Sequence, residues 1–294
     1  MSNTSGYFAL RLAPQDLTLL AGAEGGDIFA DVQSVLAQGY DFPEKQLGPP
    51  KYSDFSVQLG WATSSSLFDW IATSWTAQAP SKDGALLGLS FDHDIVAERT
   101  FAGALIAETT IPTLDASAKS AGYLTVKFTP ESVQLKKGSG KAPLGQLVGQ
   151  RLWRTRNFRV QIDGLDCQHV SRVESFTVKR ALPAVHSSSG GTDIVPGPID
   201  FPNLKLTLGT LAAPSWFSWH DDFVVQGHNG ESFEKNGSIS FLAPNLKTVV
   251  STIVLHHLGI VSLVQHAGPV AQTTQLTAEL YCEQMELIKG GLGP

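Results

Sequence analysis

The sequence carries an internal repeat at an offset of about 150 residues, and this repeat constrains the fold more than any other feature. Residues 54–71 (DFSVQLGWATSSSLFDWI) align without a gap with residues 203–220 (NLKLTLGTLAAPSWFSWH), and five of the eighteen pairs are identical. Two further blocks match in the same order at nearly the same offset: 8–12 with 158–162, and 124–135 with 276–287. Such self-similarity indicates two copies of one structural unit. The alternative is a pair of unrelated β-rich domains that share common strand patterns.

The extent of the repeat divides the chain into two domains. We expect domain 1 at residues 6–138, a linker at 139–154 and domain 2 at 155–289. The segment Lys136–Pro143 (KKGSGKAP) is rich in Gly, Lys and Ser, a composition typical of a flexible connector. A chain of 294 residues is long enough for two domains of ordinary size.

Alternating hydrophobicity predicts that both domains are built mainly of β-strands. Phe8, Leu10 and Leu12 alternate with Ala9 and Arg11, and a period of two gives a strand one face for a core and one for water or a partner. Strands are expected at 85–91, 95–108 and 122–135 in domain 1, and at 237–243, 247–264 and 274–288 in domain 2. The predicted fold class is mainly β, with two tandem antiparallel β-sandwich or barrel domains, each with one short α-helix.

The two short helices are expected directly after strands that end in Gly60 and Gly209. Helical spacing of apolar residues predicts helices at 65–74 and 214–223, and Pro214 suits the first turn of the second. We expect aromatic residues to anchor each helix on the sheet of its own domain: Trp70, Trp219, Phe68 and Phe217. Stacking of a carbohydrate on the tryptophans is the alternative interpretation.

Composition and charge exclude several classes of protein. The formal net charge of −6 and the pI near 5.7 argue against specific nucleic-acid binding, because phosphate attracts a basic surface. The N-terminus (MSNTSGYFALRLAPQD) has neither the basic nor the apolar region of a signal peptide, so none is expected. The longest apolar stretch, 248–264, contains His256 and His257 and is short for a bilayer span, so no membrane association is expected. Cys167 and Cys282 can form at most one disulfide, and two small apolar thiols are the favoured interpretation.

No motif in the sequence predicts catalysis. Gly138–Lys141 (GSGK) fails the phosphate-loop pattern, because Leu135 occupies the position of the first glycine and Ala142 follows the lysine. Asp92-His93-Asp94 offers metal-ligand atoms but suits a polar turn better. His256 and His257 are adjacent in an expected strand, so their side chains point to opposite faces; one buried and one exposed histidine are expected. We therefore expect no catalytic residue, no cofactor, no metal and no enzymatic activity.

Several motifs together resemble the tail-tube fold of contractile phages and related injection systems, which include the type VI secretion tube protein. The motifs are the strand and turn Phe158–Leu165 (FRVQIDGL), the strand Phe201–Gly209 (FPNLKLTLG), Trp219 on a short helix and Glu279 in the closing strand. Domain 1 repeats this outline more loosely, with 52–55 (YSDF), Gly60 and Trp70. The chain departs from the family at Leu59 and Leu208, where a basic residue often precedes the strand-ending glycine, and at His256-His257, which replaces a proline-containing strand.

The resemblance implies a structural subunit of a phage tail or phage-like contractile injection particle. Tube proteins of this family build six-fold rings that stack into a hollow tube, so two such domains per chain imply a trimeric, pseudo-hexameric ring. The implied partners are further copies of the chain and the sheath, baseplate or cap proteins of the particle. The resemblance places the protein in a virion or phage-like particle assembled in the cytoplasm. A single-ring baseplate hub, tail terminator or adaptor remains an alternative, as does a β-sandwich binding module or an enzyme with an unrecognised site.

Two long segments, 38–53 and 183–200, occupy the same place in the two domains. Both are rich in Gly, Pro or Ser and are expected to be irregular loops, which in compact domains are usually functional or disordered. The resemblance implies that such segments reach over to a neighbouring ring or subunit. We therefore expect them to mediate ring stacking through Tyr40, Phe42, Pro43, Pro49, Pro50, Ser187, Gly190, Gly191, Asp193, Pro196 and Pro198.

Overall fold

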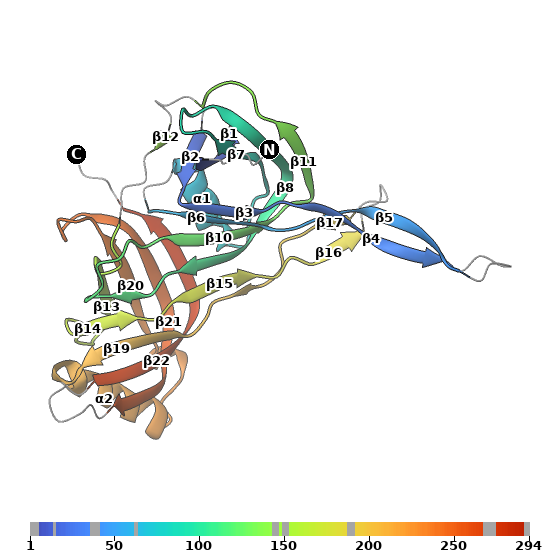
Figure 1. Cartoon of the computed structure of the whole chain (residues 1–294). Helices are drawn as coiled ribbons and strands as arrows, with labels where there is room; N and C mark the ends of the chain where they lie inside the picture. The colour runs from blue at the N-terminus through green and yellow to red at the C-terminus, as the bar shows by residue number, and fades with distance from the viewer. Residues whose placement is uncertain are drawn as a thin grey trace.

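The computed structural model describes residues 6–13, 16–35, 42–61, 64–142, 147–148, 153–186, 192–266 and 275–290. Within these ranges the chain is mainly β, with short helices at the edge of the sheets (Figure 1). The predicted mainly β fold class is confirmed. In the described part, no helix has the length and apolar character needed to cross a membrane.

The first sheet is built from the first half of the chain and is extended by strands of the second half. Its main path runs β12-β2-β1-β7-β8-β10-β6-β3, while β11 and β15 also pair with β8, and β18 pairs with β15. The strands are β1 (Tyr7–Ala13), β2 (Asp16–Leu20), β3 (Gly22–Gly25), β6 (Phe55–Leu59), β7 (Lys82–Leu89), β8 (Ile95–Ile111), β10 (Leu124–Thr129), β11 (Ser132–Lys137), β12 (Leu147–Val148), β15 (Phe176–Arg180) and β18 (Ile199–Asp200).

The strand predicted at 122–135 is in fact two strands. β10 ends before Pro130, and β11 begins at Ser132 and pairs with another part of β8. Proline has no N–H to donate to a ladder, so it interrupts a strand in the interior of a sheet.

The second sheet has the order β13-β20-β21-β22-β19-β14-β9. Its strands are β13 (Phe158–Ile162), β14 (Val170–Val173), β19 (Leu204–Gly209), β20 (Lys235–Leu242), β21 (Val249–His266), β22 (Gln275–Lys289) and β9 (Leu114–Asp115). β9 belongs to the first half of the chain, so each half lends a strand to the sheet of the other.

The two segments predicted to be irregular loops, 38–53 and 183–200, contain strands of two β-hairpins. One hairpin pairs β4 (Ile28–Val35) with β5 (Glu44–Tyr52), and the other pairs β16 (Ala184–His186) with β17 (Thr192–Ile194). We call these the first arm and the second arm; both project from the same side of the body (Figure 1). The prolines Pro49 and Pro50 lie within β5, where an exposed two-stranded ribbon tolerates a missing donor.

The described helices are α1 (Ser65–Ser74) and α2 (Ala213–His220), with a 3₁₀ turn η2 (Thr210–Ala212), a π-helical turn η3 (Asp221–Val225) and a 3₁₀ turn η4 (Glu231–Phe233). The range predicted for α1 is confirmed, and its N-terminus is capped because Leu67 N donates to Ser64 Oγ at 3.3 Å. The second helix begins one residue earlier than predicted, and the π-helical turn replaces its last predicted residues.

The two halves share one hydrophobic core. Trp61 of the first half packs on Phe241 of the second, with ring centroids 3.9 Å apart, and Trp153 packs edge-on against both rings. The segment expected to be a flexible connector is also bound to the first sheet: Ile95 N donates to Gly140 O, and Ala142 N donates to His93 O. The described residues of this segment are therefore hydrogen-bonded to the first sheet and do not form a flexible linker.

Candidate assembly interface

Strand β15 adds to the end of β8 and thereby joins the second half of the chain to the first. Phe176 faces Ile111, and Val178 faces Thr109, in an antiparallel register. In this part of β8, β10 pairs with one edge. β15 therefore lies on the other edge, which pairs with β7 as far as Ala104 and is free of β7 beyond that residue. Phe176 and Val178 are buried, so this junction combines backbone hydrogen bonds with apolar burial.

Arg180, the last residue of β15, fastens the junction from the second half. Its guanidinium donates to Ser74 O at 2.9 Å, to Thr76 O at 2.5 Å and to Gly197 O at 2.6 Å. Ser74 is the last residue of α1, where unpaired carbonyls and the helix dipole favour a cation. Burial lowers the pKa of Arg180, but an arginine remains charged at any physiological pH. No sequence motif marks this residue, because two of its three backbone partners, Ser74 and Thr76, lie about a hundred residues away.

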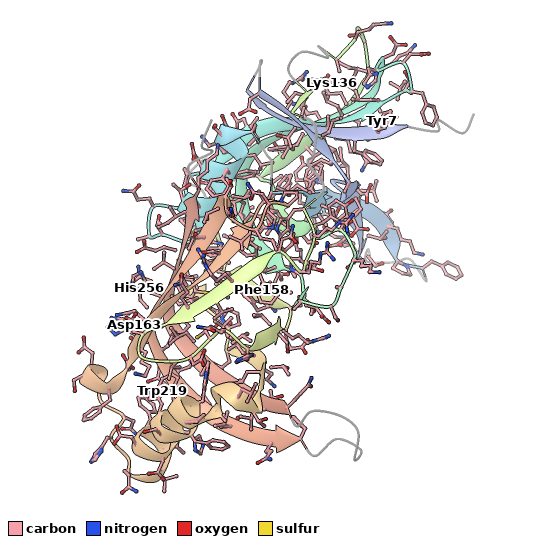
Figure 2. All side chains as sticks on the ribbon, turned by 90° about the vertical axis from the view of Figure 1, so that its left-hand side faces the viewer. Tyr7, Lys136, Phe158, Asp163, Trp219 and His256 are labelled. Atoms are coloured by element: carbon pink, nitrogen blue, oxygen red, sulfur yellow. The ribbon has the colours of Figure 1, made fainter. Side chains whose placement is uncertain are left out.

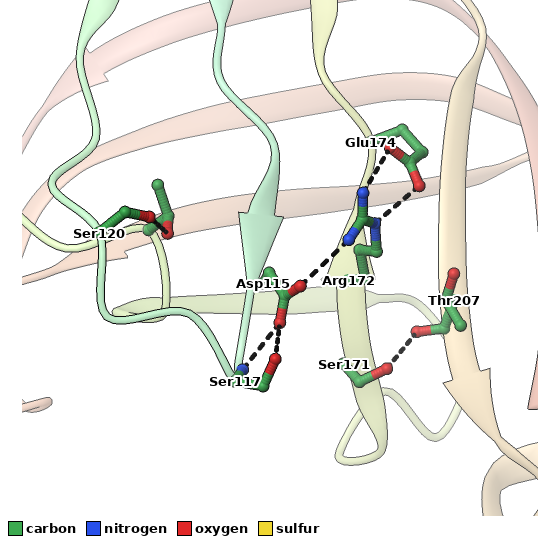
Figure 3. Close-up of polar contacts among 8 residues, drawn as sticks. Asp115, Ser117, Ser120, Ser171, Arg172, Glu174 and Thr207 are labelled. Atoms are coloured by element: carbon green, nitrogen blue, oxygen red, sulfur yellow. Dashed lines mark hydrogen bonds and ion pairs between the residues drawn. The ribbon is translucent and has the colours of Figure 1, made fainter.

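A second junction forms where β9 of the first half pairs with β14. Arg172 Nη1 donates to Asp115 Oδ2 at 3.1 Å and Arg172 Nε donates to Glu174 Oε1 at 2.7 Å (Figure 3). Hydrogen bonds from the side chain and backbone of Ser117, followed by the charge of Arg172, hold the pKa of Asp115 below its usual range. The carboxylate therefore stays ionised and paired with Arg172 across the junction.

In the second half, one edge of β21 has no strand paired with it beyond Leu258 among the described residues. β20 covers this edge of β21 only as far as Leu258, whereas β22 covers the opposite edge through His266. The exposed side chains along the bare segment include Val261 and Val264. Unpaired N–H and C=O groups on such an edge attract another strand.

β8 and β21 each contain a bulge, which allows their residues to be aligned. The register of β8 slips between Ile106 and Glu108 opposite β10, and the register of β21 slips between Ile260 and Ser262 opposite β22. Counting onward from the bulge, residues 262–265 of β21 correspond to residues 108–111 of β8, which β15 covers.

Strand β4 pairs with β5 in the same register in which β15 pairs with β18. Lys179 and Arg180 of β15 face Asp200 and Ile199, just as Phe29 and Ala30 of β4 face Lys51 and Pro50. The same register makes Ile28 the counterpart of Val178. Val178 is 3% exposed, whereas Ile28 is 42% exposed and, among the described residues, is paired on one side alone, with Tyr52 of β5. Among the described residues, two strand edges thus lack a paired strand: the edge of β21 beyond Leu258, and the edge of β4 that faces away from β5.

The residues predicted to mediate stacking fall on the two arms or next to them. Phe42 is 82% exposed, and Pro43 lies just before β5. Asp193 is on β17, while Pro196 and Pro198 lie in the segment between β17 and β18. Tyr40, Ser187, Gly190 and Gly191 lie outside the described residues. The arms also expose apolar residues that sequence analysis missed, namely Phe29, Val32, Val35 and Leu47.

The helix anchors are tryptophans, with one error in the prediction. Trp70 and Trp219 are buried, as is Phe68, and Figure 2 labels Trp219 on helix α2. Phe217 is 44% exposed and is not an anchor. The anchor that was missed is its neighbour Trp216, which is fully buried and donates from Nε1 to Asp166 O at 2.9 Å. Trp70 makes the matching bond to Pro80 O at 2.9 Å, so the indole hydrogen bond signals the anchor better than the aligned phenylalanine does.

Replacing Trp216 with alanine is expected to lower the free energy of unfolding by about 3–5 kcal/mol, because a large buried side chain and its hydrogen bond are lost. Phe217→Ala, one residue along the same helix, is expected to change it by less than about 0.5 kcal/mol, because the ring is largely in water. Urea denaturation followed by tryptophan fluorescence or circular dichroism measures both. Equal losses for the two variants would show that the anchors are wrongly assigned.

The two adjacent histidines both have carboxylate neighbours and are both partly exposed, which corrects the expectation of one buried and one exposed ring. His256 Nε2 lies 3.4 Å from Glu286 Oε1, and His257 Nδ1 lies 2.9 Å from Glu234 Oε2. His256 lies at the margin of the second sheet in Figure 2. His257 sits at a bulge with a φ of 55°.

Glu234, His257 and Glu283 form a cluster whose ligand atoms lie within 4.8 Å of one another, close enough to hold a cation. The hydroxyl of Tyr281 donates to Glu234 Oε1 at 2.6 Å. Burial, followed by the hydrogen bond and charge of Glu234, raises the pKa of Tyr281, so the hydroxyl stays a donor. Sequence analysis missed this cluster, because its members come from three different segments.

Both cysteines are free thiols, in agreement with the favoured interpretation. Burial raises the pKa of Cys167 to about 11 and that of Cys282 to about 11. Thiolate chemistry is therefore suppressed at both positions.

Comparison with known proteins gives matches among solved structures alone: no family model matches the chain, and neither does any curated protein. The chain is similar to the tube-terminating cap of the anti-feeding prophage, with 15% identity and a TM-score of 0.40 over 47% of this chain and 91% of that one. It is also similar to a chain of the sheath–tube complex of the extracellular contractile injection system PVC, with 17% identity and a TM-score of 0.39 over 44% and 88%. A chain of the sheath/tube terminator of that system matches with 17% identity and a TM-score of 0.38 over 46% and 97%. These proteins belong to the group that the sequence resembles, and each likeness extends over about half of this chain.

Proposed function

We propose that the protein is a structural subunit of a phage-tail-like contractile injection particle, in which three copies close into a ring of six tube-type units. The single observation that carries the proposal is the pairing of β15 with β8, together with its unfilled counterpart at β21 and β4. The role is structural and uses no cofactor or catalytic residue.

Repetition of one contact explains how the ring closes. We propose that the two halves are tandem copies of one unit, because the β8 and β21 ladders share a bulge and the two arms share a register. Within the chain, the second unit places β15 on the first. If the next copy places β4 on residues 262–265 in the same way, each unit contacts its neighbour alike, and such head-to-tail contacts close into a ring. The six-fold rings of the tube proteins that the sequence resembles set the number of copies at three.

The arms are proposed to contact an adjacent ring or another protein of the particle. The first arm exposes Val32, Val35, Phe42 and Leu47, with exposed fractions from 54% to 82%. Apolar side chains gathered on a projecting hairpin favour a protein neighbour over water. Sheath, baseplate or cap proteins are the further partners proposed, in a particle that assembles in the cytoplasm.

Light scattering and negative-stain microscopy of the purified protein test this function. We expect a species of three chain masses, each 31.5 kDa, and ring-shaped particles that stack into tubes at high concentration. A variant with a short Gly-Ser turn in place of Ala184–Ile194 keeps β15 and β18, so it should form rings but not tubes. A monomer at every concentration would contradict the ring. Wild-type rings that never stack would favour the single-ring hub, terminator or adaptor, and tubes from the shortened variant would contradict the role of the arm.

A further inference from the structure

We infer that Glu234, His257 and Glu283 form a socket for Lys45 of the next copy in the ring. We call these three residues the acidic socket. The inference rests on the proposed ring and names the charged contact that selects the first arm of a neighbouring copy.

The second arm already makes the corresponding contact inside one chain. Ile194 on β17 donates its backbone N–H to Glu131 Oε1 of the first half at 3.4 Å. Glu131 lies immediately before β11, close to the point where β7 stops covering β8. An arm that adds its basal strand to the end of β8 therefore lays its outer strand on this glutamate.

Glu283 is the counterpart of Glu131. Ser132, the residue after Glu131, faces Ala102 of β8, and Gln284, the residue after Glu283, faces His256 of β21. In β8, Ala102 lies two residues before Ala104, the last residue that pairs with β7. In β21, His256 likewise lies two residues before Leu258, the last residue that pairs with β20. The two glutamates thus hold the same position relative to the strand that covers the opposite edge of β8 or β21, level with the point where β7 or β20 ends.

Lys45 is the counterpart of Ile194. In the second arm Ala184 faces Ile194, and in the first arm Ser34 faces Lys45, at the same distance from the base of each arm. When β4 pairs with residues 262–265 of a neighbour as β15 pairs with β8, Lys45 comes to Glu283. Its flexible side chain can then reach the other carboxylate of the socket.

The charges of the two contacts change together between the halves. Where β15 pairs with β8, Ile194 contacts Glu131. There, Ser81 stands in the position of Glu234, and Gly103 stands in the position of His257. At the bare site a lysine is to meet two carboxylates. His257 keeps the left-handed backbone of Gly103, with φ of 55° and 62°, although a side chain is disfavoured there. The extra side chains of the acidic socket are thus found only where the approaching arm carries a lysine.

The acidic socket lacks a cationic partner of its own among the described residues. The side chain of Glu234 is 8% exposed and is bonded to His257 and Tyr281, while Glu283 is exposed with no lysine or arginine in ion-pair contact in that part of the chain. Lys45 is likewise exposed, and no described carboxylate pairs with it. Two nearby carboxylates in a partly desolvated site favour the arrival of a cation.

Charge reversal tests the inference on the full chain. We expect Lys45→Glu and Glu283→Lys each to raise the protein concentration needed for half-assembly of the trimer by roughly tenfold or more, because like charges then face each other. The double variant should recover most of the loss. Lys247→Glu, on an exposed turn, is the matched control and should assemble like the wild type. Light scattering over a concentration series gives the values, and circular dichroism checks that each chain is folded.

The outcomes separate this inference from the proposed function. A wild-type protein that never forms a trimer overturns both. A wild-type trimer whose assembly is unchanged by Lys45→Glu overturns the acidic socket and leaves the ring standing. Loss of the wild-type trimer in a metal chelator, with no effect of Lys45→Glu, would show that the cluster holds a metal ion and would also overturn the inference.

Discussion

Ile28→Asp is expected to abolish ring assembly while the single chain keeps its fold. Ile28 is 42% exposed in one chain, whereas its counterpart Val178 is 3% exposed at the junction between the halves. Assembly would therefore bury the new carboxylate without a partner, at a cost of at least about 3 kcal/mol for each junction. This cost corresponds to a loss in association of roughly a hundredfold. Light scattering should show a monomer at concentrations where the wild type is a trimer.

Leu246→Asp is the control for this variant. Leu246 is 56% exposed between β20 and β21, at the opposite end of β21 from residues 262–265, so this substitution should leave assembly unchanged. A trimer from Ile28→Asp with the wild-type concentration dependence would show that β4 does not close the ring.

The sequence pattern predicted the elements whose information is local. Alternation located β8, β20 and β21 to within a few residues, and helical spacing located α1, because each depends on neighbours along the chain. The break at Pro130 was missed because the residues on both sides of it continue the same alternation. The arms were read as loops because their Gly, Pro and Ser content is typical of turns. Their hairpins form through pairing across the connection, which composition does not encode.

The pairing between the two halves could not be predicted from the sequence, for a different reason. The pairing of β15 with β8 joins residues more than sixty positions apart, and nothing in either strand names its partner. Phe217 was expected to anchor its helix because it aligns with Phe68, yet the adjacent Trp216 takes that place in the core. Alignment of the two segments thus matches positions, but the packing around each helix decides which of two neighbouring aromatic residues is buried. The proposed ring takes its type from the resemblance and its contact residues from the unpaired edge of β21 and the exposed side of β4.

Arg180→Ala is expected to cause a large loss of stability within one chain. The side chain is buried and donates to three backbone carbonyl oxygens, two of them at the C-terminal end of α1. Its removal leaves these acceptors without a partner and opens a cavity at the junction between the halves. The expected loss is about 3 kcal/mol, since hydrogen bonds to a charged group contribute more than neutral ones and unsatisfied buried groups add their own cost. For a protein of this size, such a loss lowers the melting temperature by roughly 6–12 °C.

Thermal unfolding of Arg180→Ala is best measured in the Ile28→Asp background, where assembly does not contribute to stability. Arg180→Lys keeps the charge but not the planar fork of donors, so it should recover only part of the loss. Arg159→Ala, at an exposed position of β13, serves as the control and should unfold like its parent. An unchanged melting temperature for Arg180→Ala would show that the guanidinium does not hold the halves together. The counterpart of Arg180 in β4 is Ala30, so a junction between copies lacks this clamp and is expected to open before the junction inside a chain.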